Sequence, residues 1–357
     1  MRVASSSGGD QRLTLSEAQV EQVVREGYGL NVVSQRRLGG EVDLNVWIKT
    51  DGATEFLLKV SRGTMSPPLL WQEKVHTHLA EVAPELPVPR LIAGQSGAKM
   101  LPIEISGDPL VVRLLSWMPG RMLADIPELP DHLLFELGAI AARMTEALAS
   151  LDVEEDLDES HLWDIRKARE AVDAALPFVS DPMDRAAVSQ LMRRFDQVLG
   201  DLRDLPAGVV HQDLNDFNVL AAPDPSGRLV ITGVIDVNDS LLTVRVAELA
   251  IAVAYAMLRQ SDPLGAAASV VAGFNSVVRL DPAEIRVIFP LAGARLCVNA
   301  ATWRRRTTES SHPYGEDRMR HTWPTLHQLA EITTAEAERR LGSACGAAVS
   351  HSQNPEV

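Results

Sequence analysis

Along the first third of the chain, apolar residues alternate with polar ones or form short runs, a pattern typical of β-strands. Leu44, Val46 and Ile48 alternate with polar neighbours. The pair Asp51-Gly52 that follows is a hairpin signal. Ser16 and Gln19 form a capping-box pattern ahead of a helical valine spacing. The pattern predicts strands at 32–38, 44–48, 56–60, 100–105 and 109–115, and helices at 16–27 and 67–80.

From Asp131 onward the spacing of apolar residues becomes helical. Leu133, Leu137 and Ile140 recur every three or four residues and place one apolar stripe on a long helix. Only short β-type runs interrupt the helical pattern, near 209–211, 218–221 and 229–235. Further helices are predicted over 162–176, 182–200, 244–259, 264–278, 282–305 and 324–341.

The two patterns meet at Pro119-Gly120, which interrupts regular structure. We therefore expect an α+β fold with an N-terminal antiparallel sheet lobe over residues 13–117 and a helix-rich C-terminal lobe over 118–342. Residues 1–12 and 343–357 lack an apolar period and are expected to be mobile tails.

Composition narrows the classes of partner. The 357 residues are 46% hydrophobic and carry a formal charge of -14, so a nucleic acid or an anionic membrane is an unsuitable partner and a cationic amine is a suitable one. Cys297 and Cys345 lie in unlike contexts, which argues against a disulfide framework. No secretory start opens the chain and no run approaches about 18 apolar residues, so we expect a soluble, cytoplasmic protein. The oligomeric state stays open.

The stretch His211-Gln-Asp213-Leu-Asn-Asp-Phe-Asn218 joins two β-type runs and is expected to form a loop on a rigid scaffold. Asp213 offers a carboxylate that accepts a proton, and Asn218 offers a neutral oxygen. Asp236 follows the apolar run 229–235 and offers a second carboxylate. Because Mg²⁺ prefers oxygen ligands, Asp213 as base with Asn218 and Asp236 as metal ligands would equip the chain for phosphoryl transfer. The alternative is that the loop residues only form a turn.

With these residues the chain resembles the aminoglycoside phosphotransferase and choline kinase-like superfamily, and it is most similar to the hydroxylysine kinase group. The resemblance spans residues 16–341 and implies a two-lobed, protein-kinase-like fold in which His211 is structural. Protein kinases have arginine in place of Gln212 and Phe-Gly in place of Val237-Asn238. These differences favour a small-molecule kinase that is not controlled by phosphorylation of an activation loop.

The resemblance implies a nucleotide site in the N-terminal lobe. Lys59 lies in the apolar strand 56–60, where its ammonium group needs an anion; it would contact the nucleotide phosphates and pair with Glu73 of the next helix. Lys49, on another strand, is the alternative for this role.

Two backbone segments complete the implied nucleotide site. Gly39 and Gly40 would give the phosphate-covering loop its flexible backbone, with Asn45 approaching the phosphates; a plain β-turn is the alternative. Ser116 and Trp117 end the segment that would form the inter-lobe hinge and read the base. Either ATP or GTP could be the donor, since members of the hydroxylysine kinase group can use GTP.

The prediction of an acceptor site depends on two segments that resemble the same group. Trp163 would line the acceptor pocket, and Arg295 would bind a carboxylate through two N–H groups of its guanidinium. Asp239 is a candidate carboxylate for the substrate. An interface tryptophan, a helix-surface arginine and a solvated turn residue are the alternatives for the three positions.

These expectations together predict a Mg²⁺-dependent enzyme that moves the γ-phosphate of ATP or GTP to the hydroxyl of a small amine or amino-acid acceptor, like hydroxylysine kinase. Aminoglycoside, homoserine or amino-alcohol O-phosphotransferase activity is the alternative with the same chemistry. A catalytically silent nucleotide-binding regulator is the alternative of a different class, although such a protein has no chemical need for all four of Lys59, Asp213, Asn218 and Asp236.

Overall fold

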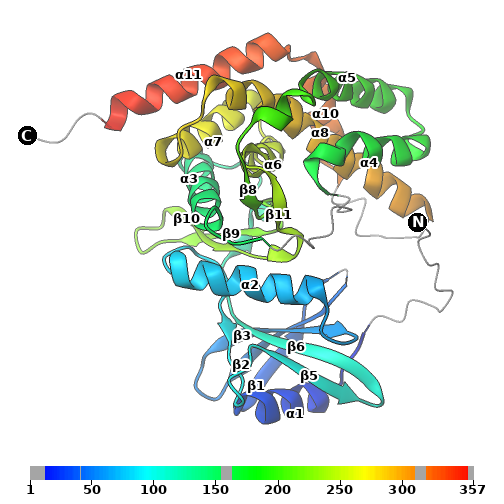
Figure 1. Ribbon diagram of the computed structural model, residues 1–357, viewed down its shortest axis with the longest axis vertical. Helices are drawn as coiled ribbons and strands as arrows, with labels where there is room; N and C mark the ends of the chain where they lie inside the picture. Colours follow the sequence, from blue (N-terminus) through cyan, green and yellow to red (C-terminus); the bar gives the residue numbers. More distant parts are fainter. Residues whose placement is uncertain (1–12, 41, 154–162, 310–318, 353–357) are drawn as a thin grey trace, which may run out of the picture. The chain divides into compact units, whose positions relative to one another are not determined.

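The chain folds into two compact units (Figure 1). The computed structural model describes residues 13–40, 42–153, 163–309 and 319–352. Of the described residues, those within 13–77 and 89–117 form the first unit, and those within 78–88 and 118–352 form the second. The chain passes between the units at Trp117, beside the Pro119-Gly120 break, but residues 78–88 lie in the second unit, which the sequence pattern did not predict. The predicted tail at 1–12 lies outside the described residues.

The first unit is built on a six-stranded sheet in which every pairing is antiparallel. The strand order is β1-β2-β3-β6-β4, and β5 also pairs with β6. The bounds are Val32–Arg37 (β1), Leu44–Thr50 (β2), Glu55–Arg62 (β3), Leu91–Ile92 (β4), Met100–Ile105 (β5) and Asp108–Ser116 (β6). The five predicted strands are confirmed, and β4 is an addition too short to show a period.

One face of this sheet is covered by α1 (Glu17–Tyr28). The predicted capping box is confirmed, because the Gln19 N–H donates to Ser16 Oγ at 3.3 Å and the Ser16 N–H donates to Gln19 Oε1 at 2.8 Å. The buried valines of the helix pack with strand residues such as Ile48 and Leu58. Alternation in β2 therefore points its apolar side chains at α1.

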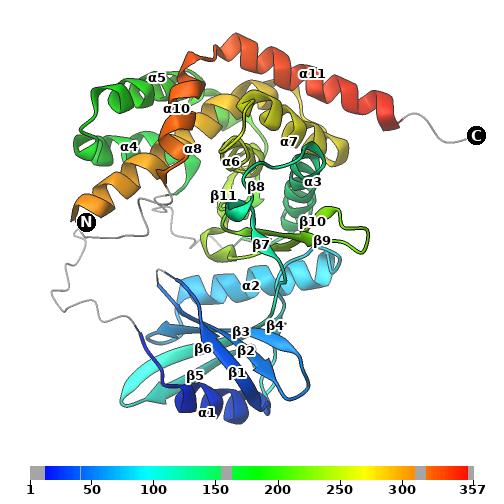
Figure 2. The same cartoon turned by 180° about the vertical axis from the view of Figure 1, so that it is seen from behind.

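The opposite face receives α2 (Pro67–Val82), whose first part belongs to this unit (Figures 1 and 2). Leu69 packs with Met100 and Val111, whereas Val112 belongs to the core under α1. Because neighbouring residues of a strand point to opposite faces, β6 contributes to both layers.

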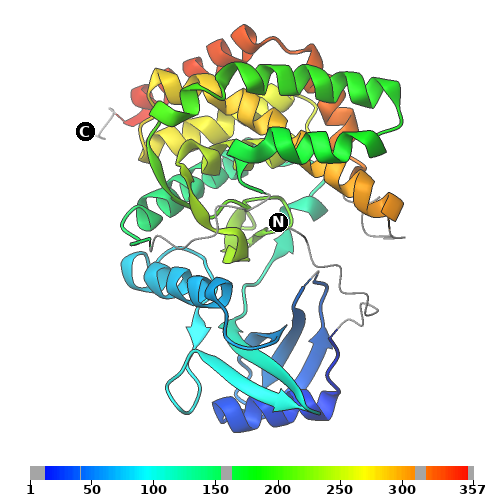
Figure 3. The same cartoon turned by 45° about the vertical axis from the view of Figure 1, so that its right-hand side comes forward.

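The second unit is mostly helical, with α6 inside and α3, α7 and α8 packed against it or one another (Figures 1 and 3). All residues of α6 are buried. The bounds are Asp131–Leu148 (α3), Ala168–Ala175 (α4), Pro182–Val198 (α5), Val246–Ala256 (α6), Pro263–Val277 (α7), Pro282–Glu309 (α8), Thr322–Glu331 (α10) and Thr334–Ser352 (α11).

Two predictions about the C-terminal helices are wrong. The single helix expected over 324–341 is two helices, since α10 ends at Glu331 and α11 begins at Thr334. The backbone of α11 also stays helical to Ser352, within the segment 343–357 that was expected to be a tail. Chain ends are hard to predict because local composition does not show which surface they dock on.

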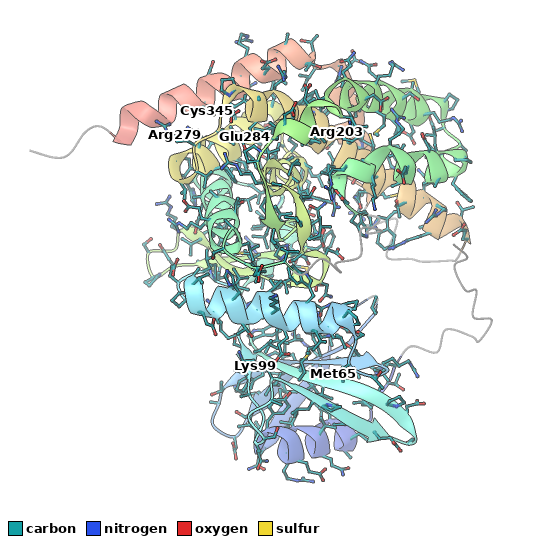
Figure 4. All side chains as sticks on the ribbon, in the orientation of Figure 1. Met65, Lys99, Arg203, Arg279, Glu284 and Cys345 are labelled. Atoms are coloured by element: carbon teal, nitrogen blue, oxygen red, sulfur yellow. The ribbon has the colours of Figure 1, made fainter. Side chains whose placement is uncertain are left out.

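The start of α8 is joined to the start of α6 by an ion pair whose carboxylate is buried. Arg245 Nε donates to Glu284 Oε1 at 2.7 Å, and its Nη2 donates to Oε2 at 2.8 Å; Glu284 is fully buried. Figure 4 labels Arg279 and Glu284 in this part of the unit, and the Arg279 carbonyl accepts from Arg245 Nη2. By length and composition α8 could cross a membrane, but 83% of its most apolar window is buried within the protein, as in a core helix.

Two small sheets lie beside the helices of this unit (Figure 2). One has the order β10-β9-β7, and the other pairs β11 with β8. The bounds are Arg121–Met122 (β7), Ala207–Val210 (β8), Val219–Pro223 (β9), Leu229–Val234 (β10) and Leu241–Val244 (β11). The chain between β8 and β9 contains the candidate catalytic motif, so both sheets fix its ends.

Two glycines let α3 and α7 approach until their backbones touch. A Cβ built on Gly138 would lie 1.9 Å from the Val270 carbonyl oxygen, and one on Gly273 would lie 1.9 Å from that of Phe135. Neither backbone can move without separating the helices. We expect Gly273→Ala to lower the free energy of unfolding by about 1–3 kcal/mol or more, measured by urea denaturation.

Gly342→Ala is the matched control, because Gly342 lies in α11 with nothing within 4 Å of an added Cβ. There the substitution should be neutral or stabilise by about 0.5–1 kcal/mol through helix propensity. Equal stability of Gly273→Ala and the parent would refute the close approach.

Candidate active site

The motif that begins at His211 forms a loop that hydrogen bonds fix to the surrounding protein. His211 is fully buried, and burial lowers its pKa. Its neutral ring can donate from Nε2 to the Ile235 carbonyl at 3.2 Å while Nδ1 accepts the Asp213 N–H at 3.2 Å. Further along, Asp216 Oδ2 accepts from Arg259 Nη1 at 2.7 Å, and both side chains are buried. These contacts make the loop rigid, and those of His211 are structural.

Three side chains donate hydrogen bonds to the Asp213 carboxylate. Its Oδ1 accepts from Arg295 Nη2 at 2.6 Å and from Asn215 Nδ2 at 2.8 Å, and its Oδ2 accepts from Asn218 Nδ2 at 2.6 Å. Burial raises the pKa of Asp213 to about 6; Arg295 opposes this rise, and Asp239 adds to it. The side chain is still 18% exposed. It can therefore take a proton from a bound group that reaches it.

Asn218 and Asp236 come together through the backbone. The Ile235 N–H donates to the Asn218 carbonyl at 2.8 Å, which places the residue after β10 beside the loop. Asn218 Nδ2 is bound to Asp213, so the amide oxygen Oδ1 is turned away from that carboxylate. Asp236 has a left-handed backbone, with φ 68°, and is close enough to raise the pKa of Asp213. One carboxylate and one amide oxygen are donors that Mg²⁺ accepts, so the two residues fit a magnesium ion.

The two acceptor-end residues predicted from the sequence, Trp163 and Arg295, meet beside Asp213. Arg295 is 3% exposed, and its guanidinium carbon lies 4.7 Å from the centroid of the Trp163 ring. The same guanidinium carbon lies 5.8 Å from the centroid of the Tyr255 ring, and Arg295 Nε donates to the Tyr255 hydroxyl oxygen at 3.3 Å. The alternative of a helix-surface arginine is wrong, because Arg295 is buried between two aromatic rings. Asp239 lies three residues after Asp236, and its negative charge acts to raise the pKa of both Asp213 and Arg295.

Gln212 links the loop to this aromatic pair. Its backbone has φ 68°, which non-glycine residues rarely adopt, and its Nε2 donates to the Trp163 carbonyl at 2.7 Å. Sequence reasoning used Gln212 only to exclude a phosphorylated activation loop. It missed this contact and Tyr255, because no spacing in the chain connects residues that tertiary packing brings together. It also missed Asn215, although Asn215 lies within the motif, two residues from Asp213.

Glu248 supports the loop from α6 and is fully buried. Its Oε2 accepts the Gln212 N–H at 3.1 Å. Burial raises the pKa of Glu248 from 4.5 to about 8, and the backbone N–H groups of Gln212 and His211 oppose the rise. Glu248 is the single acidic residue of this otherwise apolar helix, which is a sequence signal for such a support.

This pKa predicts how stability depends on pH. Between about pH 4.5 and 8 the folded state holds a proton on Glu248 that the unfolded state has lost, so the free energy of unfolding should fall as pH rises. Glu248→Gln keeps an oxygen acceptor and removes the titration, so its stability should depend less on pH across this window. Urea denaturation at several pH values measures the difference.

Glu338→Gln, at an exposed position of α11, is the control and should follow the parent curve. Parallel curves for Glu248→Gln and the parent would show that Glu248 does not carry the proposed proton.

In the first unit, Lys59 lies in a buried polar cluster. Lys59 Nζ is 3.7 Å from Asp43 Oδ2, which also accepts from Arg113 Nη2 at 2.8 Å. Ser61 Oγ donates to Asp43 Oδ1 at 2.7 Å, and Arg113 Nη1 donates to Gln72. The pairing of Lys59 with Glu73 stays a prediction. Sequence reasoning missed Asp43 and Arg113, although both lie in segments that it assigned to the nucleotide site.

The predicted phosphate-covering loop has a compact backbone. Asn45 Nδ2 donates to the Gly39 carbonyl at 3.1 Å, and a Cβ on Gly40 would lie 2.4 Å from the same Nδ2. Gly40 is therefore needed for the close approach of Asn45. In the predicted hinge, the Ser116 N–H donates to the Arg90 carbonyl at 2.9 Å, and the Arg90 N–H donates to Ser116 Oγ at 2.9 Å. The Trp117 N–H donates to the Glu55 carbonyl at 3.3 Å. Their contacts with a nucleotide stay predictions.

Comparison with known proteins identifies the family. Residues 34–285 match the model of the phosphotransferase enzyme family. The chain belongs to this family. A hydroxylysine kinase of Bos taurus is 30% identical over 322 residues, covering 82% of this chain and 84% of that protein. A homoserine kinase of Methylobacillus flagellatus is 30% identical over 219 residues, covering 61% of this chain and 63% of that protein.

A solved structure has a similar fold. An amicoumacin kinase in complex with AMP-PNP and Ca²⁺ superposes with a TM-score of 0.64 at 14% identity, covering 90% of this chain and 97% of that one. The predicted kinase-like fold is thus confirmed. As a member of the phosphotransferase enzyme family, the chain is a small-molecule kinase with an alcohol group as acceptor. A nucleotide donor and a divalent metal are consistent with the family.

Proposed function

We propose that this phosphotransferase moves the γ-phosphate of ATP or GTP to the hydroxyl of a small amine-bearing acceptor, with 5-hydroxylysine as the first candidate. The observation that carries the proposal is that Asp213 and Asn218 of the loop and Arg295 of α8 are joined by hydrogen bonds in one partly buried site. Supporting it, the hydroxylysine kinase of Bos taurus is similar over most of both chains. The homoserine kinase similarity favours a second candidate of the same kind, a smaller hydroxy amino acid.

Each residue has a defined task in this proposal. Asp213 holds the acceptor hydroxyl and takes its proton as the oxygen attacks the γ-phosphorus; the bond to the bridging oxygen breaks, and the nucleoside diphosphate leaves. Asn218 and Asp236 hold Mg²⁺, which neutralises phosphate charge when bound. Lys59 contacts the phosphates. Most of the rate gain would come from positioning and from charge neutralisation.

An acceptor panel tests the proposal. Purified protein is supplied with ATP or GTP and with 5-hydroxylysine, homoserine, 1-amino-2-propanol or an aminoglycoside, and nucleoside diphosphate release is followed. We expect release above the acceptor-free rate, fastest with 5-hydroxylysine. If 5-hydroxylysine gives no more than the acceptor-free rate, it is not the acceptor; nucleotide binding without turnover on any acceptor would favour a silent regulator.

A further inference from the structure

The guanidinium group of Arg295 contacts three other residues, Trp163, Tyr255 and Asp213. Trp163 and Tyr255 stack against it, and Nε donates to the Tyr255 hydroxyl. Nη2 donates to Asp213 at 2.6 Å. Gln212 in turn fixes the Trp163 backbone. A planar group held in this way loses little further freedom when it binds a ligand, so its orientation is set before a ligand arrives.

The third nitrogen of the Arg295 guanidinium group is Nη1. Within the part of the chain that the structure describes, the buried Nη1 of Arg295 has no hydrogen-bond partner. A buried donor without a partner is costly, which makes Nη1 a ready site for an acceptor of hydrogen bonds. Nε is hydrogen-bonded to Tyr255, and Nη2 is hydrogen-bonded to Asp213. Nη1 lies next to Nη2 at the end of the planar guanidinium group. A group bound to Nη1 would therefore lie beside Asp213.

We propose that Arg295 Nη1 binds the carboxylate of the acceptor while Asp213 receives the acceptor hydroxyl. This inference rests on the proposed function and narrows its substrate class to hydroxy amino acids with a free carboxylate. Amino alcohols and aminoglycosides lack that group, so they leave Nη1 without a partner. The charge of Asp239 near Arg295 suits the amine of the same zwitterion.

A matched pair of acceptors tests the carboxylate directly. 5-Hydroxylysine and its carboxamide share the hydroxyl and amine groups, but the amide is neutral, is a weaker acceptor and carries an NH₂ donor in place of one carboxylate oxygen. For the parent enzyme we expect kcat/KM to be about 10- to 100-fold higher with the acid than with the amide, the range for a hydrogen bond to a charged group. Equal values would overturn the inference and leave the proposed function standing. Turnover of neither compound, nor of any other acceptor, would overturn the proposed function itself.

Two variants assign the effect to Arg295. In Arg295→Met the ratio of kcat/KM for the acid to kcat/KM for the amide should fall to about 1, because methionine has no N–H group that could bind the carboxylate. The ratio is taken within one variant, so a general loss of rate from the missing Asp213 contact cancels. Tyr255→Phe is the control: it removes the partner of Nε and leaves Nη1, so its ratio should stay near that of the parent. A high ratio that persists in Arg295→Met would overturn the assignment, and the parent comparison decides the carboxylate question even if a variant does not fold.

Discussion

Replacing Asp213 by asparagine is expected to lower kcat for acceptor phosphorylation by about 10²- to 10⁴-fold, the usual contribution of a positioned base. Asparagine has nearly the same shape and keeps an oxygen for Arg295 and Asn215, but it cannot take a proton. Because the proposed role is at the acceptor hydroxyl, the KM for the nucleotide should change little. Steady-state kinetics with varied donor and varied acceptor separate the two effects.

Asp173→Asn is the matched control, since Asp173 is an exposed residue of α4 whose side chain is 58% accessible. The same chemical change there should leave kcat unaltered. Unfolding curves of both variants show whether the fold is kept. Acceptor-dependent turnover of Asp213→Asn within a few-fold of the parent would mean that Asp213 is not the base.

The second large effect is expected at Asp236. Asp236→Asn should lower kcat/KM by at least about 10²-fold and raise the Mg²⁺ concentration needed for half-maximal activity, because a carboxylate ligand becomes neutral. Asparagine tolerates the left-handed backbone found here, so the turn should survive. A titration of activity with Mg²⁺ measures both quantities.

Asp239→Asn removes the same charge three residues away and is the control for long-range electrostatics. It should leave the Mg²⁺ requirement near that of the parent, whatever it does to acceptor binding. If the two variants shift the requirement equally, the effect is one of total charge and Asp236 is not a metal ligand.

Short-range patterns in the sequence were enough to predict the strands of the first unit and the catalytic loop. The alternation in β2 and the capping box of α1 are local, and each led to the observed element. The closeness of Asp213 and Asn218 also follows from their spacing within one loop. Short strands such as β7 and β11 were missed, because two to four residues do not establish a period.

Contacts between distant segments could not be predicted in the same way. Trp163 and Arg295 were singled out by resemblance, yet only the tertiary packing of the segment before α4 against α8 shows that they stack beside Asp213. In the first unit, the ion pairs of Asp43 with Lys59 and with Arg113 were not predicted; the pairing of Lys59 with Glu73 stays a prediction. Buried polar clusters depend on which side chains meet across the sheet, and spacing along the chain does not encode that.

The most direct test of the proposed reaction is the identity of the phosphorylated product. Parent enzyme is incubated with Mg²⁺, ATP or GTP, and 5-hydroxylysine, and the mixture is followed by ³¹P NMR and mass spectrometry. The predicted result is a phosphate monoester on the acceptor hydroxyl that accumulates in step with nucleoside diphosphate and is absent with Asp213→Asn. Inorganic phosphate as the sole phosphorus product besides the nucleotide would contradict it.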